Sequence, residues 1–152
     1  VYYNQIRGQH GNRYADLTQD PAFAFGEGLS YTTFAYGEVV IDGADTPFST
    51  DGTVHASVTL TNTGDRPGVE VVQAYVGDLV TSYSWTDREL KAFRRVELQP
   101  GESATVTFDI PVADCTIVDP DARRIVEPGE FELLIGHSSR RGDLKRATFT
   151  VA

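Results

Sequence analysis

The feature that most constrains the fold is a strict alternation of apolar and polar residues in two short segments, 53–62 and 103–110. Side chains point alternately to the two faces of a β-strand, so a period of two separates apolar residues from polar ones. Each segment is therefore predicted to be a strand with one face in the core and the other in water. The apolar positions are Val54, Ala56, Val58, Leu60, Ala104, Val106, Phe108 and Ile110.

Further short apolar runs are separated by Gly, Pro, Asp and Asn, which is the pattern of strands and turns. The run at 69–77 is more continuous, as is typical of a central strand that is covered on both faces. In 90–98 we expect Phe93, Val96 and Leu98 to anchor the core. No segment has an apolar stripe at helical spacing, so the sequence predicts an all-β fold, an antiparallel two-sheet immunoglobulin or fibronectin type III-like sandwich. The other predicted strands are 32–41, 115–118, 124–126, 131–136 and 147–151.

The chain divides into an N-terminal arm and one domain. Residues 1–24 have no sustained period and contain Gly8, Gly11 and Pro21, so we expect an irregular linker; residues 25–152 form the domain. Large aromatic rings gain most from burial. We therefore expect the arm to lie on another domain, and partly on its own sandwich, through Tyr2, Tyr3, Phe23 and Phe25.

Charge and composition exclude several classes of function. The formal net charge of −9 argues against nucleic acid, which needs a basic patch. No apolar run approaches the roughly 20 residues of a membrane-spanning helix. Cys115 is the only cysteine, so it is interpreted as a core residue, and neither an intrachain disulfide nor a cysteine metal cluster can form. The chain lacks Met and begins at Val1, so we expect a fragment or a processed product.

Several motifs in a fixed order make the sequence resemble a known family. They are FGEGLSYTTF at 25–34, TLTNTGDRPGVEVVQAYVGD at 59–78, RELKAFRRVELQPGESATVTFDI at 88–110 and EPGEFELLIGHSS at 127–139. The chain resembles the C-terminal fibronectin type III-like domain of family 3 glycoside hydrolases, the β-glucosidase and β-xylosidase group. The arm resembles the connector that precedes this domain.

The resemblance implies a domain whose enzyme carries its catalytic machinery elsewhere. The parent enzyme would release terminal β-linked sugars, and this chain would pack on the upstream catalytic domains without a cofactor. No residue here matches the catalytic motifs of the family, so no catalytic position is assigned. Homo-oligomer contact, and either a cytoplasmic or a secreted location, stay open.

The residues themselves give no catalytic or metal site. Glycoside hydrolysis needs two carboxylates that flank the sugar, but the acidic residues that stand out lie in or beside turns, where solvated carboxylates are common. The three histidines have no partner at metal-ligand spacing, and no serine lies in a nucleophile elbow. These acidic residues are Asp42, Asp45, Asp65, Asp119, Asp121 and Glu127.

The sequence of one loop suggests that it binds a sugar. Tyr83, Trp85 and Arg88 lie in 78–88, and aromatic rings in a loop can stack on sugar faces. The residues Trp85 to Arg88 depart from the Arg-Pro-Val-Lys-like pattern that is usual there in the family. Two alternatives to an accessory domain follow: a carbohydrate-binding module that uses this loop, and an adhesion-type module with a protein partner.

Overall fold

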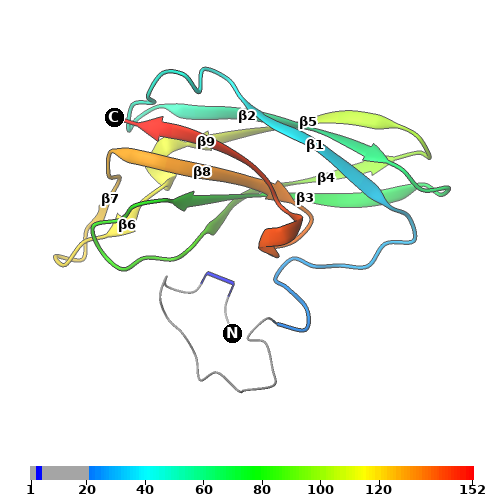
Figure 1. Cartoon of the computed structure of the whole chain (residues 1–152), viewed down its shortest axis with the longest axis horizontal. Coiled ribbons are helices and arrows are strands. Elements are labelled where there is room, and N and C mark those ends of the chain that lie inside the picture. Colours follow the sequence, from blue (N-terminus) through cyan, green and yellow to red (C-terminus); the bar gives the residue numbers. More distant parts are fainter. Residues whose placement is uncertain (1–2, 5–20) are drawn as a thin grey trace.

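The computed structural model describes residues 3–4 and 21–152, in which nine strands form two stacked antiparallel sheets and a small hairpin (Figure 1). This confirms the predicted all-β sandwich. The three-stranded sheet has the order β1-β2-β5 and the four-stranded sheet the order β4-β3-β8-β9. The bounds are β1 Phe34–Ile41, β2 Thr53–Asn62, β3 Gly68–Asp78, β4 Glu89–Leu98, β5 Ser103–Pro111, β6 Ile117–Val118, β7 Arg124–Ile125, β8 Gly129–Gly136 and β9 Lys145–Val151.

The core lies between the inner faces of the two sheets. The alternating residues of β2 and β5 point inward as predicted: Val54, Leu60 and Phe108 are fully buried. They face apolar residues of β3 and β8, of which Val72 and Leu133 are also fully buried. Each strand that the sequence predicts is present, with ends that differ by about two residues at most.

Strand β3 is central in the four-stranded sheet, between β4 and β8, as its continuous apolar run predicts. The prediction that Phe93 anchors the core is wrong. The pairing of β4 with β3 is regular from Ala92 to Leu98, and Phe93 lies at odd spacing from Val96 and Leu98, opposite Gln73. Phe93 consequently points to the outer face and is 61% exposed, whereas Leu98 is buried and Val96 packs partly against the core.

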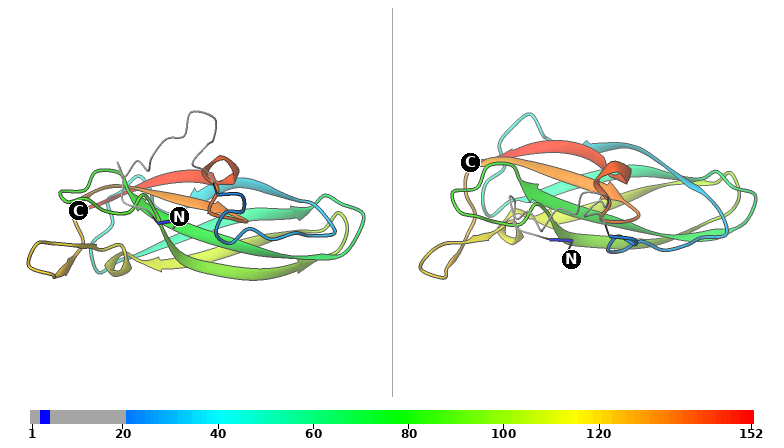
Figure 2. Two further views of the ribbon diagram at one scale, coloured as in Figure 1. Left: turned by 90° about the horizontal axis from the view of Figure 1, so that it is seen from below. Right: turned by 60° about the horizontal axis from the view of Figure 1, so that its bottom comes forward.

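The chain enters the sandwich along the outer face of the four-stranded sheet. In Figure 1 the described segment 21–33 lies on the side of β3 and β8, away from the three-stranded sheet, before it continues into β1. The β6–β7 hairpin projects beyond one end of the sandwich in both views of Figure 2. No helix in the described ranges is long and apolar enough to cross a membrane.

Candidate interaction surface

A tight turn fixes segment 24–27 to the outer face of the four-stranded sheet. The Ala24 carbonyl accepts a hydrogen bond from the Glu27 amide at 3.1 Å, and the Ala24 amide donates to Glu27 Oε2 at 2.7 Å. Gly26 has φ +77°, and a Cβ there would lie 2.0 Å from Gln73 Oε1. Only glycine permits both this backbone conformation and this close approach. The motif FGEG is therefore a docking turn for the sheet.

The turn is joined to two neighbouring elements. Gln73 Nε2 donates to the carbonyl oxygens of Gly26 at 3.0 Å and His137 at 2.6 Å. The Ser139 amide donates to the Phe25 carbonyl at 2.8 Å, and Arg140 forms an ion pair with Glu27 at 3.0 Å. The turn after β8 thus holds the entering segment against β3.

Three aromatic rings pack where the arm meets the sheet. The Tyr3 and Phe25 rings are stacked with centroids 4.3 Å apart, and Tyr3 meets Tyr75 of β3 edge-on at 5.8 Å. The Tyr3 hydroxyl accepts a hydrogen bond from the Leu90 amide at 3.1 Å. Tyr75 is fully buried although it belongs to the outer face; burial, followed by the nearby Tyr3, raises the pKa of Tyr75 to about 12.

The predicted arm residues that the structure describes differ in their contacts and in their exposure. Tyr3 and Phe25 pack on the sandwich of this chain, but Phe25 remains 48% exposed and Phe23 is 74% exposed. Tyr2 lies outside the described residues.

Apolar side chains on the sheet continue the exposed surface of the arm. Phe93 lies opposite Gln73 and so beside the Gly26 turn, and Val71 and Val69 follow along β3 on the same face. All three are exposed to a third or more of their surface. We call Phe23, Phe25, Val69, Val71 and Phe93 the apolar patch. Contiguous exposed apolar side chains of this kind mark interaction surfaces.

A charged network covers the other half of the same sheet face. The Glu132 side chain, on β8, is only 1% exposed and pairs with Arg141 at 2.6 Å and Arg146 at 3.1 Å. Arg141 also pairs with Asp87 at 3.1 Å, which joins the sheet to the 79–88 loop. Burial would raise the pKa of Asp87, but the hydrogen bonds and positive charges of Arg141 and Arg88 outweigh it and lower that pKa.

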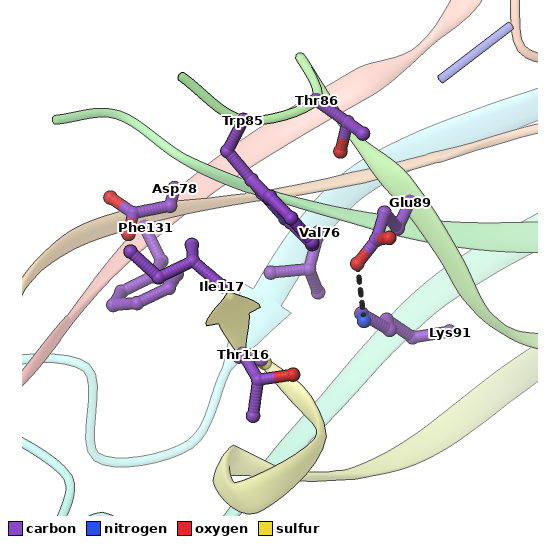
Figure 3. Close-up of a pocket in the computed structure, with 10 residues that line it drawn as sticks. Val76, Asp78, Trp85, Thr86, Glu89, Lys91, Thr116, Ile117 and Phe131 are labelled. Carbon is purple, nitrogen blue, oxygen red and sulfur yellow. Dashed lines mark hydrogen bonds and ion pairs between the residues drawn. The ribbon is translucent and has the colours of Figure 1, made fainter. Parts of the chain in front are cut away.

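The loop residues that suggested sugar binding have different surroundings. The Trp85 ring extends into a small cavity of about 20 Å³ that Val76, Ile117 and Phe131 also line (Figure 3). This volume suits about one water molecule and no sugar ring. Arg88 instead hydrogen-bonds to Asp87 and to the Ser139 carbonyl, while Tyr83 is 41% exposed.

The titratable groups of the described segments do not assemble a metal centre. No three His, Cys, Asp or Glu side chains among them gather closely enough to hold a metal ion. His55 pairs with Asp109 at 2.6 Å on the exposed face of the three-stranded sheet. Cys115 is buried, and this burial raises the pKa of its thiol to about 11. A thiol with so high a pKa is a poor nucleophile at neutral pH.

Sequence reasoning singled out aromatic residues of the arm but not the residues of the sheet face. Gln73, Glu132 and Val71 were not singled out as site residues. The available signal was the apolar run that continues across both faces of β3 and β8, because such a run indicates a strand covered on both sides. Glu132 within Phe131–Leu133 is the clearest case, since a lone acid in such a run needs a buried partner.

The sandwich belongs to the fibronectin type III-like class. Residues 70–139 match the family model of the fibronectin type III-like domain. Curated relatives include a β-xylosidase of Formosa agariphila, 43% identical over 95% of this chain, and a periplasmic β-glucosidase of Salmonella typhimurium, 38% identical over 98%. A solved β-glucosidase involved in saponin metabolism from intestinal bacteria is 79% identical over 99% of this chain, with a TM-score of 0.93.

The chain covers about a fifth of each of these proteins, namely 19% of the β-xylosidase and 20% of the two β-glucosidases. The chain is therefore a fibronectin type III-like domain of the family 3 glycoside hydrolases, as its motifs indicate.

Proposed function

We propose that the chain is the non-catalytic C-terminal accessory domain of a β-glucosidase-like enzyme and stabilises that enzyme by packing on its upstream catalytic domains. The observation that carries this proposal is the apolar patch. Phe23 is 74% exposed and Phe93 61% exposed. Side chains of this size gain about 1.5 to 3 kcal/mol each when a partner removes them from water.

The position of the patch also supports the proposal. It lies where the entering segment meets the sheet, so any part of the enzyme that precedes this segment is tethered beside it. A tether raises the effective concentration of the partner and favours even a modest interface. The relatives are about five times longer than this chain, which supports a partner within the same polypeptide.

The proposed parent activity follows from the relatives. β-Glucosidases and β-xylosidases share this domain, and the 79% identical protein is a β-glucosidase involved in saponin metabolism. We expect the parent enzyme to hydrolyse terminal β-glycosidic bonds. Saponin β-glucosides are the first substrates to test.

The test compares substitutions in the parent enzyme with the same substitutions in the isolated 152-residue chain. Phe93→Ser should shorten the half-life of β-glucosidase activity at elevated temperature and leave the unfolding of the isolated chain nearly unchanged. Val80→Ser is the matched control, because Val80 is 80% exposed on a loop outside the patch. This substitution should change neither the half-life of the enzyme activity nor the unfolding of the isolated chain.

Two results would contradict the proposal. One is an unchanged half-life in the Phe93→Ser enzyme. The other is turnover of a β-glucoside by the isolated chain. A saturable change in Trp85 fluorescence during titration with β-gluco-oligosaccharides would favour the carbohydrate-binding module instead.

A further inference from the structure

The two long sides of the sandwich differ in how their edges are covered. On one side β1 and β9 lie together, and Phe48 pairs with the chain end: the Phe48 amide donates to the Thr150 carbonyl at 2.8 Å, and the Ala152 amide to the Phe48 carbonyl at 2.9 Å. On the other side the edge strands β4 and β5 also lie near each other, but in the described segments no isolated bridge covers their outward edges as Phe48 covers the end of β9. The outward backbone edges of β4 and β5 therefore flank an open side of the molecule.

A groove of about 220 Å³ lies along this open side. Val96 and Val106 are part of its apolar lining, Thr105 and Thr107 of β5 contribute hydroxyl groups, and Arg94 and Arg95 line it from β4. The four residues 104–107 of β5 span about 13 Å at the rise of a strand. The groove thus has the length of about four residues of an extended peptide.

The charge of the groove is opposite to that of the chain. The protein has a formal net charge of −9, yet neither Arg94 nor Arg95 forms an ion pair with an acidic residue in the described segments. Arg94 is held in place: its guanidinium lies 5.5 Å from the centre of the Phe108 ring and donates to the Phe93 carbonyl at 3.0 Å. Two arginines without acidic partners favour a ligand that carries carboxylates.

We propose that the groove between β4 and β5 binds an extended acidic peptide, which adds to an open strand edge and places carboxylates against Arg94 and Arg95. Strand addition supplies main-chain hydrogen bonds, and alternate side chains give specificity. A saccharide is a poorer match, because none of the residues that line the groove is aromatic and Phe108 is fully buried. This inference does not rest on the proposed function, although Arg95 lies opposite Val71 of the apolar patch.

The experiment measures fluorescence anisotropy of a labelled, N-acetylated and C-amidated hexapeptide of alternating Glu and Thr with the 152-residue chain. We expect saturable binding that weakens as salt rises. The Arg94→Gln/Arg95→Gln double variant should bind about tenfold more weakly or worse, whereas Arg124→Gln, on the exposed β7 strand, should bind as the unchanged chain does. Amide resonances of residues 94–96 and 104–107 should shift in the complex.

Arg95→Gln alone keeps the test valid if loss of Arg94 disturbs folding, because the Arg95 side chain makes no hydrogen bond or ion pair in the described segments. Three results would overturn the proposal. They are equal binding of an alternating Lys and Thr peptide, binding of oligogalacturonate but not of the Glu peptide, and no binding together with self-association of the arginine variants. The last result would show that the arginines only protect the open edges from pairing with other chains.

Discussion

The outer faces of the two sheets have the same strand geometry, but one faces water and part of the other is covered by the chain. On the three-stranded sheet the outward residues remain in water: Thr59 and Thr107 are exposed, and His55 and Asp109 form a surface pair. On the four-stranded sheet the outward residues Tyr75 and Glu132 are as buried as the core. In a strand of the first kind apolar and polar residues alternate along the sequence, whereas a strand of the second kind does not show this alternation.

This difference shows that a covered outer face needs its own set of partners. A face in water needs only polar side chains, because water satisfies them. Under a cover, each polar group must find a protein partner, which is why Gln73 binds two carbonyl oxygens and Glu132 binds two arginines. The cover consists of the entering segment, the turn after β8 and the 79–88 loop. The four-stranded sheet therefore depends on contacts that are remote in sequence.

The sharpest test of the comparison replaces one outward residue on each face. Tyr75→Ala should lower the free energy of unfolding by about 3 to 5 kcal/mol, because it removes a fully buried ring that packs against Tyr3. Thr59→Ala should change it by about 1 kcal/mol or less, since Thr59 is exposed. Urea denaturation measures both. Similar losses in the two variants would show that the faces do not differ as described.

The next test removes the partners of the buried carboxylate. In the Arg141→Ala/Arg146→Ala variant we expect a loss of about 2 to 3 kcal/mol, because Glu132 is left charged in a buried position. Glu132→Gln should cost less, since the two arginines are about half exposed and water can solvate them. The same denaturation experiment gives both values. If Glu132→Gln costs more than the double variant, the network is not organised around the buried acid.

The third test separates close approach from backbone conformation. Gly26 and Gly101 both have positive φ, at +77° and +75°, but a Cβ at Gly26 would collide with Gln73, whereas a Cβ at Gly101 would meet no atom within 4 Å. Gly101→Ala should therefore cost about 1 kcal/mol through backbone strain alone. Gly26→Ala should cost at least about 1 kcal/mol more, since its methyl group would displace Gln73. Equal losses would mean that the turn can move away from the sheet without cost.

The same contrast explains how far the sequence predicts the structure. The alternation in β2 and β5 predicts those strands and their inward residues, because one face meets the core and the other meets water. The expectation that Phe93 lies in the core was wrong because Phe93 lies at odd spacing from Val96 and Leu98, so that the alternation of β4 turns it to the other face. The sequence of β4 carried this signal, whereas the bulge between Leu90 and Ala92 depends on pairing with β3 and could not be read from β4 alone.

The candidate surface was predictable only in part for a similar reason. The aromatic content of the arm predicted that Tyr2, Tyr3, Phe23 and Phe25 meet a surface. It did not indicate that Tyr3 meets Tyr75, because that contact joins segments far apart in the chain. The pairing of Glu132 with Arg141 and Arg146 likewise requires the fold of the turn between β8 and β9.

The smallest expected effect is the pH dependence of stability that Glu27 of the docking turn contributes. The hydrogen bond from the Ala24 amide, followed by that from Arg140, lowers the pKa of Glu27 from its ordinary value of 4.5. A carboxylate with a lowered pKa in the folded state contributes stability above the pKa of the unfolded state. That contribution is lost as pH falls through the lower value of the folded state. Acid should therefore loosen the covered face at this turn.

Glu27→Gln removes this pH dependence. The unchanged chain should be more stable than the variant above about pH 5, and the difference should shrink as pH falls below about 4.5. Urea midpoints measured from about pH 3 to pH 7 give this difference. Arg140→Gln serves as the matched variant, because it removes only the second of the two causes and should leave part of the pH dependence. A difference that stays constant with pH would show that the Gln variant loses a hydrogen bond and that the charge of Glu27 contributes nothing.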